Sequence, residues 1–292
     1  MANTERNTAR LQALAAALLF STGGAGIKLE SFTPMQISMV RSGIAAIILM
    51  LWLERRTVWR PAALGAGVVY AATLTLFVAA TKLTTAANAI YLQSTAPLYL
   101  LILAPFVLHE RVRRRDVVYL VSIGLGMILC FVGSPAATAT APNPGTGNLL
   151  GAATGLTWAL TLLALRRIGR DRTSRGSTVA AVVAGNAIAC LGAAPFALPL
   201  PAAAAAEWIT LVYLGVFQIG LAYVCLSGAI QHLPALEISL LLLLEPVLNP
   251  VWTWMVRGAN PGRWTITGGA VILVATAARV IYEGRQVNGR AD

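Results

Sequence analysis

The polar side chains of this sequence are few, and they lie scattered through long apolar runs. Neither His109 nor His232 has a carboxylate pair beside it, so the pattern offers no acid–base or nucleophilic constellation. The three cysteines lack metal-ligand spacing, and no GxxxxGK[ST] phosphate loop is present. We therefore expect no catalytic centre, no metal site and no cofactor. Such side chains could instead bind a small amphipathic molecule within apolar surroundings.

One segment places hydrogen-bonding groups at helical spacing. Asn88, Leu92, Thr95 and Tyr99 follow one another at steps of four, three and four residues, so they share one face of an α-helix. We interpret this face as the wall of a ligand cavity. The alternative is hydrogen bonding between neighbouring helices, which in a membrane is worth about 0.6 to 2 kcal/mol per contact.

Aromatic side chains could form another wall of such a cavity. Phe77 and Thr81 share a face of one predicted helix, and Trp158 lies in another. Their rings would stack on aromatic or thioether groups at about 0.5 to 1.5 kcal/mol each. The alternative is the commoner role of membrane aromatics, which is to fill helix interfaces or to anchor at the headgroup level.

Glu245, Glu237 and Arg41 are charged residues inside predicted apolar helices. A carboxylate at such depth costs a few kcal/mol unless it is paired, hydrated or protonated. Glu245 could carry a proton, capture a ligand ammonium, or bond backbone groups freed beside Pro246. Glu237 could act in the same way, or could be hydrated near its helix end. For Arg41 we expect a structural role, either at a helix C-terminus or through snorkelling to an interface.

The elements that position these residues follow from the composition. Of the 292 residues, 57% are hydrophobic and only 11% are charged, against about 25% charged in an average soluble domain. No charged residue occurs between Asp116 and Arg166, or between Arg175 and Glu207. This balance excludes an ordinary soluble enzyme and predicts an all-α, multi-pass protein whose main partner is the lipid bilayer.

The net charge of +11 does not indicate nucleic-acid binding. The basic residues form short bursts between apolar runs rather than one patch, with centres near Arg6, Arg56, Arg113, Arg170 and Arg285. If the N-terminus is cytoplasmic, these bursts all fall on the cytoplasmic side, and the opposite side holds Lys28, Lys82, Arg257 and Arg263. This asymmetry predicts that both termini are cytoplasmic.

We predict ten transmembrane helices. They cover about 11–27, 35–53, 62–81, 85–107, 117–133, 148–165, 177–198, 207–230, 233–256 and 264–282. The uncharged, proline-containing stretch between the fifth and sixth helices predicts an extracytoplasmic linker. The expected organisation is a first repeat over 1–134, a linker over 135–147, a second repeat over 148–283 and a cytoplasmic tail over 284–292.

Spacings shared by the two halves indicate an internal repeat. Ala80 precedes Pro97 by 17 residues, and Ala229 precedes Pro246 by 17, at a constant offset of 149. Because each half has five helices, an odd number, the second copy must be inverted in the membrane, as in transporters with a site near the midplane. Kinks at Pro97 and Pro246 could then act as gates.

The repeat also adds candidates to the cavity. Phe20 precedes Lys28 by eight residues, just as Trp158 precedes Arg166, so Phe20 and Trp158 are repeat counterparts. Tyr223 corresponds to Leu74 at the offset of 149. We expect Phe20 to join Phe77, Thr81 and Trp158 in an aromatic box, with Tyr223 as a further candidate for the cavity.

Several segments resemble the drug/metabolite transporter superfamily, and within it the ten-helix exporters built from two EamA domains. They are Phe20-Ser21-Thr22-Gly23, Thr95-Ala96-Pro97, His109-Glu110-Arg111, Gly151 to Ala159, and Glu245-Pro246-Val247. Within the superfamily the sequence looks most like bacterial aromatic amino-acid exporters. It departs from the pattern at Val256-Arg257-Gly258-Ala259, where these domains usually end the helix with Gly-Glu.

The resemblance implies a secondary transporter of the bacterial inner membrane that exports amino acids, aromatic or otherwise bulky and apolar, by alternating access. One alternative is export of drugs or other metabolites by the same fold. Another is a membrane sensor or assembly subunit that moves nothing, although the sequence shows no soluble signalling domain. No obligatory protein partner is expected.

Overall fold

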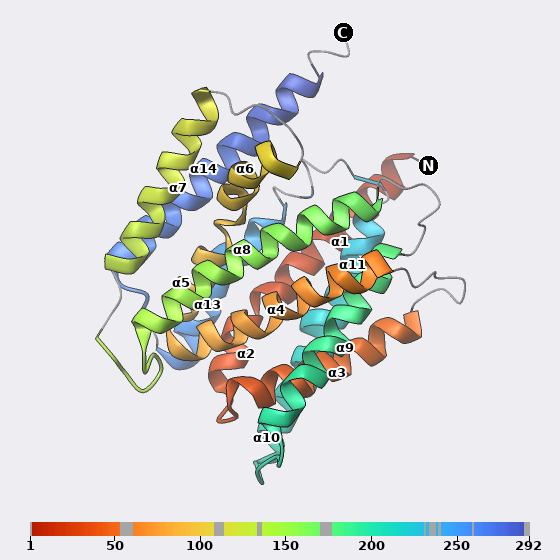
Figure 1. The fold of residues 1–292 in the computed structure, drawn as a ribbon, viewed down its shortest axis with the longest axis vertical. Coiled ribbons are helices and arrows are strands. Elements are labelled where there is room, and N and C mark those ends of the chain that lie inside the picture. The colour runs from red at the N-terminus through yellow and green to blue at the C-terminus, as the bar shows by residue number, and fades with distance from the viewer. Residues whose placement is uncertain are drawn as a thin grey trace.

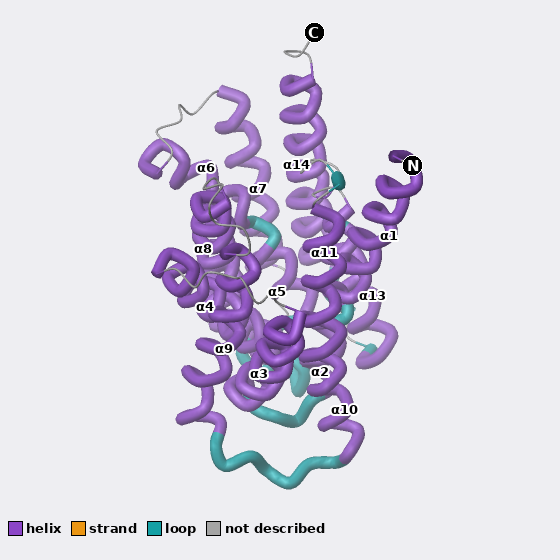
Figure 2. The backbone as a smooth tube through the Cα atoms, turned by 90° about the vertical axis from the view of Figure 1, so that its right-hand side faces the viewer, coloured by secondary structure: helices purple, strands orange, loops and turns teal. Residues whose placement is uncertain are grey.

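The fold was established from a computed structural model of the chain. It describes residues 2–52, 61–107, 114–132, 136–169, 177–230, 232–233, 238, 241–258 and 260–288. Within these ranges the chain is helical apart from turns, short loops and one isolated bridge between Thr138 and Ala141 (Figure 2). The predicted all-α architecture is confirmed.

The helices of the first half begin near the N-terminus. They are α1 (Ala2–Ser21), α2 (Gly23–Leu29), α3 (Pro34–Trp52), α4 (Pro61–Leu83), α5 (Ala86–Gln93), α6 (Ala96–Val107) and α7 (Arg114–Val132). The second half contains α8 (Pro144–Gly169), α9 (Ser177–Ala197), α10 (Ala205–Tyr213), the π-helix η1 (Leu214–Leu221), α11 (Ala222–Ile230), α13 (Leu244–Arg257) and α14 (Arg263–Asn288).

Among the described residues, five helical stretches are long and apolar enough to cross a membrane. They are Pro34–Trp52, Pro61–Leu83, Pro144–Leu165, Val179–Ala197 and Ala205–Ala229. Their lengths match the roughly 20 residues that a hydrocarbon core requires. The shorter apolar helices include Val117–Val132 within α7.

Two of the predicted helices, 11–27 and 85–107, are not continuous, which corrects the sequence prediction. The first breaks at Thr22, whose hydroxyl donates to the Leu19 carbonyl and which is followed by two glycines, the poorest helix formers after proline. The second breaks at Ser94 and Thr95, just before Pro97. A third predicted helix, 207–230, contains the π-helix η1, and in a fourth, 233–256, a turn at Leu243 precedes α13.

The breaks of the two halves are related by the sequence repeat. Ser94 and Leu243 are 149 residues apart, the same offset that separates Pro97 from Pro246. Proline has no N–H to continue a helix but is tolerated in the first turn. Each of these prolines accordingly lies in the first turn of the helix that follows the break. The proline kinks expected from the sequence are therefore full interruptions.

Helices from the two halves interleave instead of forming separate bundles. From the first half, α4 packs on both α8 and α9 of the second half, and α3 packs on α9. At the other side α7 pairs with α14, and α1 packs on α11 and α13 (Figure 1). The N-terminal end of α1 and the C-terminal end of α14 lie at the same end of the molecule (Figures 1 and 2). This arrangement is the one expected for the predicted even number of crossings.

Candidate functional site

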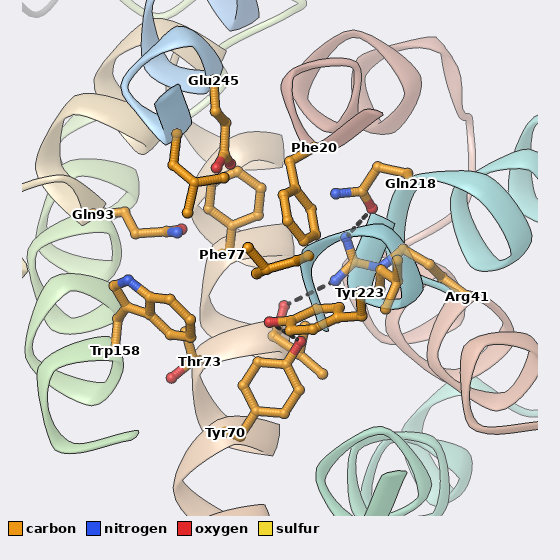
Figure 3. A pocket seen from close by; sticks show the side chains of 14 residues that line it. Phe20, Arg41, Tyr70, Thr73, Phe77, Gln93, Trp158, Gln218, Tyr223 and Glu245 are labelled. Atoms are coloured by element: carbon orange, nitrogen blue, oxygen red, sulfur yellow. Dashed lines mark hydrogen bonds between the residues drawn. The ribbon is translucent and has the colours of Figure 1, made fainter. Parts of the chain in front are cut away.

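A cavity of about 110 Å³ lies where the two halves meet (Figure 3). Its walls come from α1, α3, α4 and α5 of the first half and from α8, η1, α11 and α13 of the second, with Leu242 just before α13. Aromatic and aliphatic side chains dominate the lining, with a small number of polar groups. The residues are Phe20, Arg41, Tyr70, Thr73, Leu74, Phe77, Gln93, Trp158, Gln218, Ile219, Tyr223, Leu226, Leu242 and Glu245.

Five aromatic residues form an aromatic wall of the cavity, and four of them are in ring-to-ring contact. The Phe20 ring meets the Tyr223 ring edge-on at 5.2 Å between centroids, and Tyr223 meets Tyr70 at 5.9 Å. Trp158 lies 6.3 Å from Tyr70 on the opposite repeat, and Phe77 also faces the cavity (Figure 3). The structure thus brings together Phe20, Phe77 and Trp158 of the expected aromatic box and the further candidate Tyr223, but not Thr81.

Tyr70 was not anticipated, although the sequence carried a signal for it. Tyr70, Thr73 and Phe77 are separated by three and four residues on α4, so they occupy one helical face. Extending the face of Phe77 by two turns toward the N-terminus would have found Tyr70. The Tyr70 hydroxyl donates to the Tyr223 hydroxyl at 2.7 Å, which links the first repeat to the second across the cavity.

A polar wall stands beside the rings. Arg41 lies in the middle of α3 and is 1% exposed. Its Nη1 donates to Oε1 of Gln218 at 3.5 Å, and its Nη2 donates to the Leu74 carbonyl at 3.4 Å. Glu245, which is half-buried, and Gln93 enter from other sides (Figure 3).

The π-helix η1 supplies Gln218, which sequence reasoning missed. A π-turn widens a helix locally and is frequent at functional sites. The position depends on Gly23, because a Cβ there would lie 2.9 Å from Nε2 of Gln218. Apolar periodicity does not distinguish a π-turn from an α-helix, so only a lone amide in an apolar run could have drawn attention to Gln218.

The predicted polar face of the fourth helix does not line this cavity. Asn88 is fully buried and its Nδ2 donates to the Cys130 carbonyl and to Oδ1 of Asn148. The Thr95 hydroxyl donates to the Leu92 carbonyl. Around Thr95 and Tyr99 the helix packs on α8, since a Cβ at Gly155 would lie 3.0 Å from Oγ1 of Thr95 and 3.1 Å from Cε2 of Tyr99. These contacts correspond to the alternative of helix-to-helix packing and hydrogen bonding.

Two further predicted residues also lie away from the cavity or beyond what is described. Thr81 is fully buried near the end of α4, beyond Phe77. Glu237 lies outside the described residues. A ligand-binding role for either residue stays a prediction.

Pro97 and Pro246 stand next to the cavity without lining it. Each proline follows, by four residues, a residue that does line it, namely Gln93 and Leu242 respectively. A proline has no N–H for the carbonyl four residues earlier, so the Gln93 and Leu242 carbonyls lack their usual helical donor. Both helix breaks therefore leave polar backbone beside the cavity, as in transporters with interrupted helices.

The described residues contain no group of three or more His, Cys, Asp or Glu side chains placed to hold a metal ion. The cavity itself offers one carboxylate, two amides and one guanidinium among rings and aliphatic groups. This arrangement suits reversible binding of a small molecule that has both apolar and charged parts.

The EamA-like transporter family matches the chain twice, over residues 7–132 and 145–280. No curated protein matches the sequence. A solved structure described as "Crystal structure of protein" is 22% identical, with a TM-score of 0.62, over 96% of this chain and 99% of that one. At this identity the likeness concerns the fold.

Proposed function

Since the chain belongs to the EamA-like transporter family and repeats that family's domain twice, we propose that it exports amino acids with aromatic or other bulky apolar side chains. Family membership makes it a multi-pass membrane transporter of the drug/metabolite type and confirms the resemblance drawn from its motifs. The finer proposal places it in the bacterial inner membrane and gives it the central cavity as its substrate site.

The aromatic wall carries this proposal. Rings at 5.2 to 6.3 Å from one another line one side of a small space, with Trp158 and Tyr70 from different repeats. A planar or thioether side chain can stack on these faces, with about 0.5 to 1.5 kcal/mol gained per contact beyond area burial. An aromatic side chain or that of methionine has the matching chemistry.

Alternating access is the mechanism that the repeat favours. The site lies between elements of both repeats, and the helix breaks beside it occur at equivalent positions. Rocking of one repeat against the other would open the cavity to each side in turn, with the segments at Pro97 and Pro246 as hinges. Glu245 would hold the substrate ammonium or a coupling proton.

Export of cationic drugs is the second candidate, and Glu245 is the observation that favours it. A carboxylate attracts organic cations by its charge, and the aromatic rings around it add cation–π contacts. The volume argues against a drug-sized cargo, because about 110 Å³ is well below the roughly 300 to 1,000 Å³ of sites for drug-sized ligands.

The test is uptake and counterflow of labelled Phe, Trp and Met in liposomes that contain the purified protein, with and without a pH gradient. Trp158→Ala should reduce flux by about two- to tenfold, because one ring in a stacking site contributes about 0.5 to 1.5 kcal/mol. Trp254→Ala is the matched control, since Trp254 is 57% exposed and does not line the cavity.

Saturable flux that falls in Trp158→Ala and persists in Trp254→Ala supports the proposal. Liposomes that move no amino acid faster than empty vesicles would refute amino-acid transport. Flux of lipophilic cations that disappears in Glu245→Gln would then favour the drug exporter, whereas binding without any flux would favour a sensor.

A further inference from the structure

The Arg41 guanidinium stands out as a buried charge in the wall of the central cavity. The side chain is 1% exposed, and the structure contains no ion pair to it from any described residue. An arginine stays protonated in proteins, so a positive charge is held within the apolar part of the molecule. Such a charge is costly in a membrane unless something neutralises it.

Its present hydrogen bonds do not neutralise it. Both acceptors, Gln218 and the Leu74 carbonyl, are uncharged, and the distances of 3.5 and 3.4 Å exceed the usual 2.7 to 3.2 Å. Nε of Arg41 has no hydrogen-bond partner. The guanidinium is therefore positioned by neutral groups at long hydrogen-bond distances, and it retains an unused donor at Nε.

Arg41 lies at a position that an anionic ligand in the cavity can reach. Arg41 is one of the residues that line the central cavity, and Gln218 beside it lines the same space (Figure 3). A guanidinium presents its N–H groups as a planar fork whose geometry matches a carboxylate. A bound carboxylate would satisfy the free donors and neutralise the charge in one step.

We propose that Arg41 binds the carboxylate of the transported molecule, so that the substrate is a free α-amino acid in its zwitterionic form. This inference rests on the proposed function and narrows its substrate class. Glu245 lines the same cavity from α13 and takes the ammonium, while the aromatic wall takes the side chain. Gln218 is a positioning residue, because it holds Nη1 of Arg41.

This division of roles distinguishes the substrate from its close analogues. An amine or an amino-acid amide keeps the ring and the positive charge but leaves Arg41 unneutralised. A carboxylic acid without the amine pairs with Arg41 but leaves Glu245 alone. The amino acid satisfies both sites at once.

The experiment measures how phenylalanine analogues compete with labelled L-phenylalanine for counterflow in liposomes. The competitors are unlabelled L-phenylalanine, L-phenylalaninamide, phenethylamine and 3-phenylpropionate. For the wild type, phenylalanine should compete about tenfold or more better than phenylalaninamide, as expected for loss of a charge-assisted hydrogen bond. This comparison needs no variant, so a folding defect cannot obscure it.

Variants of Arg41 then test whether this side chain causes the preference for phenylalanine over phenylalaninamide. In Arg41→Gln the ratio between phenylalanine and its amide should fall to about one, and in Arg41→Lys it should fall only partly, because the charge remains without the fork. The ratio is measured within one variant and so does not depend on how much protein folds. Gln218→Leu should weaken the preference while leaving the arginine in place.

Arg257→Gln is the matched control. That arginine donates to the backbone carbonyls of Lys28 and Leu29 and does not line the cavity, so its loss should leave the ratio unchanged. Equal competition by phenylalanine and phenylalaninamide in the wild type would overturn the role of Arg41 and leave amino-acid-type transport standing. Absence of any phenylalanine flux would overturn the proposed function and this inference together.

Discussion

At the scale of single residues, the cavity combines apolar and polar contacts that cross the repeat boundary. Tyr70 of the first repeat and Tyr223 of the second are joined by a hydroxyl pair at 2.7 Å. Both rings also belong to the aromatic wall, so one hydrogen bond fixes the relative position of two stacking surfaces. In a low-dielectric site, removal of one partner of such a hydrogen bond is costly because the other hydroxyl is left unpaired.

We predict that Tyr70→Phe and Tyr223→Phe each lower the free energy of unfolding by about 1 kcal/mol, because each removes one partner of a buried hydrogen bond. The double variant should lose less than the sum of the two single losses, since the second change removes a group that is already unpaired. Denaturant unfolding in mixed micelles measures this coupling. Strictly additive losses would mean that the two hydroxyls do not interact.

At the scale of elements, glycines set how closely helices approach. Gly269 on α14 lies against the Tyr91 ring of α5, and a Cβ there would come within 2.3 Å of Cε2. An aromatic ring packed between helices cannot move aside as the end of a flexible side chain can. This contact joins the first repeat to the last helix.

Gly269→Ala should therefore destabilise the protein by about 1 to 3 kcal/mol through overpacking. Gly124→Ala is the control, because nothing lies within 4 Å of a Cβ at that position of α7. It should leave stability unchanged or raise it by up to about 1 kcal/mol, as glycine disfavours helix. Thermal unfolding in detergent checks both, and equal melting temperatures for the two variants would refute the packing argument.

At the scale of the whole molecule, the segment after α2 is held by groups from both halves. Nζ of Lys82 donates to the Glu30 carbonyl at 2.6 Å, and Arg257 donates to the Leu29 carbonyl at 2.9 Å. The Ser31 amide donates to Oε1 of Glu207 at 2.9 Å. These contacts close one end of the bundle, opposite the end that holds the two chain termini.

Glu30 should make the stability of this closed end depend on pH. Burial raises the pKa of Glu30 from the usual 4.5 to about 7, and the nearby Glu207 charge adds to the rise, against the opposing effects of Thr210 and Lys82. The folded protein then keeps a proton that the unfolded chain releases, so stability falls as pH rises from about 4.5 to about 7.

We predict that Glu30→Gln removes this dependence. The melting temperature of the variant relative to the wild type should increase between pH 5 and pH 7, when both are unfolded in detergent over that range. Glu5→Gln, a change at an exposed site on α1, is the control and should follow the wild type. Parallel pH profiles for the wild type and Glu30→Gln would show that Glu30 does not keep its proton in the folded state.

The sequence by itself determined the architecture, because a bilayer constrains a chain more strictly than water does. Apolar runs of helical length, basic bursts and a repeat offset of 149 residues predicted the all-α membrane fold and the two halves. Phe20, Phe77, Trp158 and Tyr223 could be grouped because periodicity and repeat symmetry relate residues far apart in sequence.

Only the tertiary structure decided which polar faces meet the cavity. Asn88 and Thr95 carry the spacing of a cavity wall, but Asn88 donates to the Cys130 carbonyl and the Thr95 hydroxyl bonds back to the Leu92 carbonyl. Arg41 and Gln218 occur singly in apolar runs, and their convergence depends on how α3 packs on a π-turn. Spacing along one helix cannot reveal which other helix lies opposite, so these placements required the packed molecule.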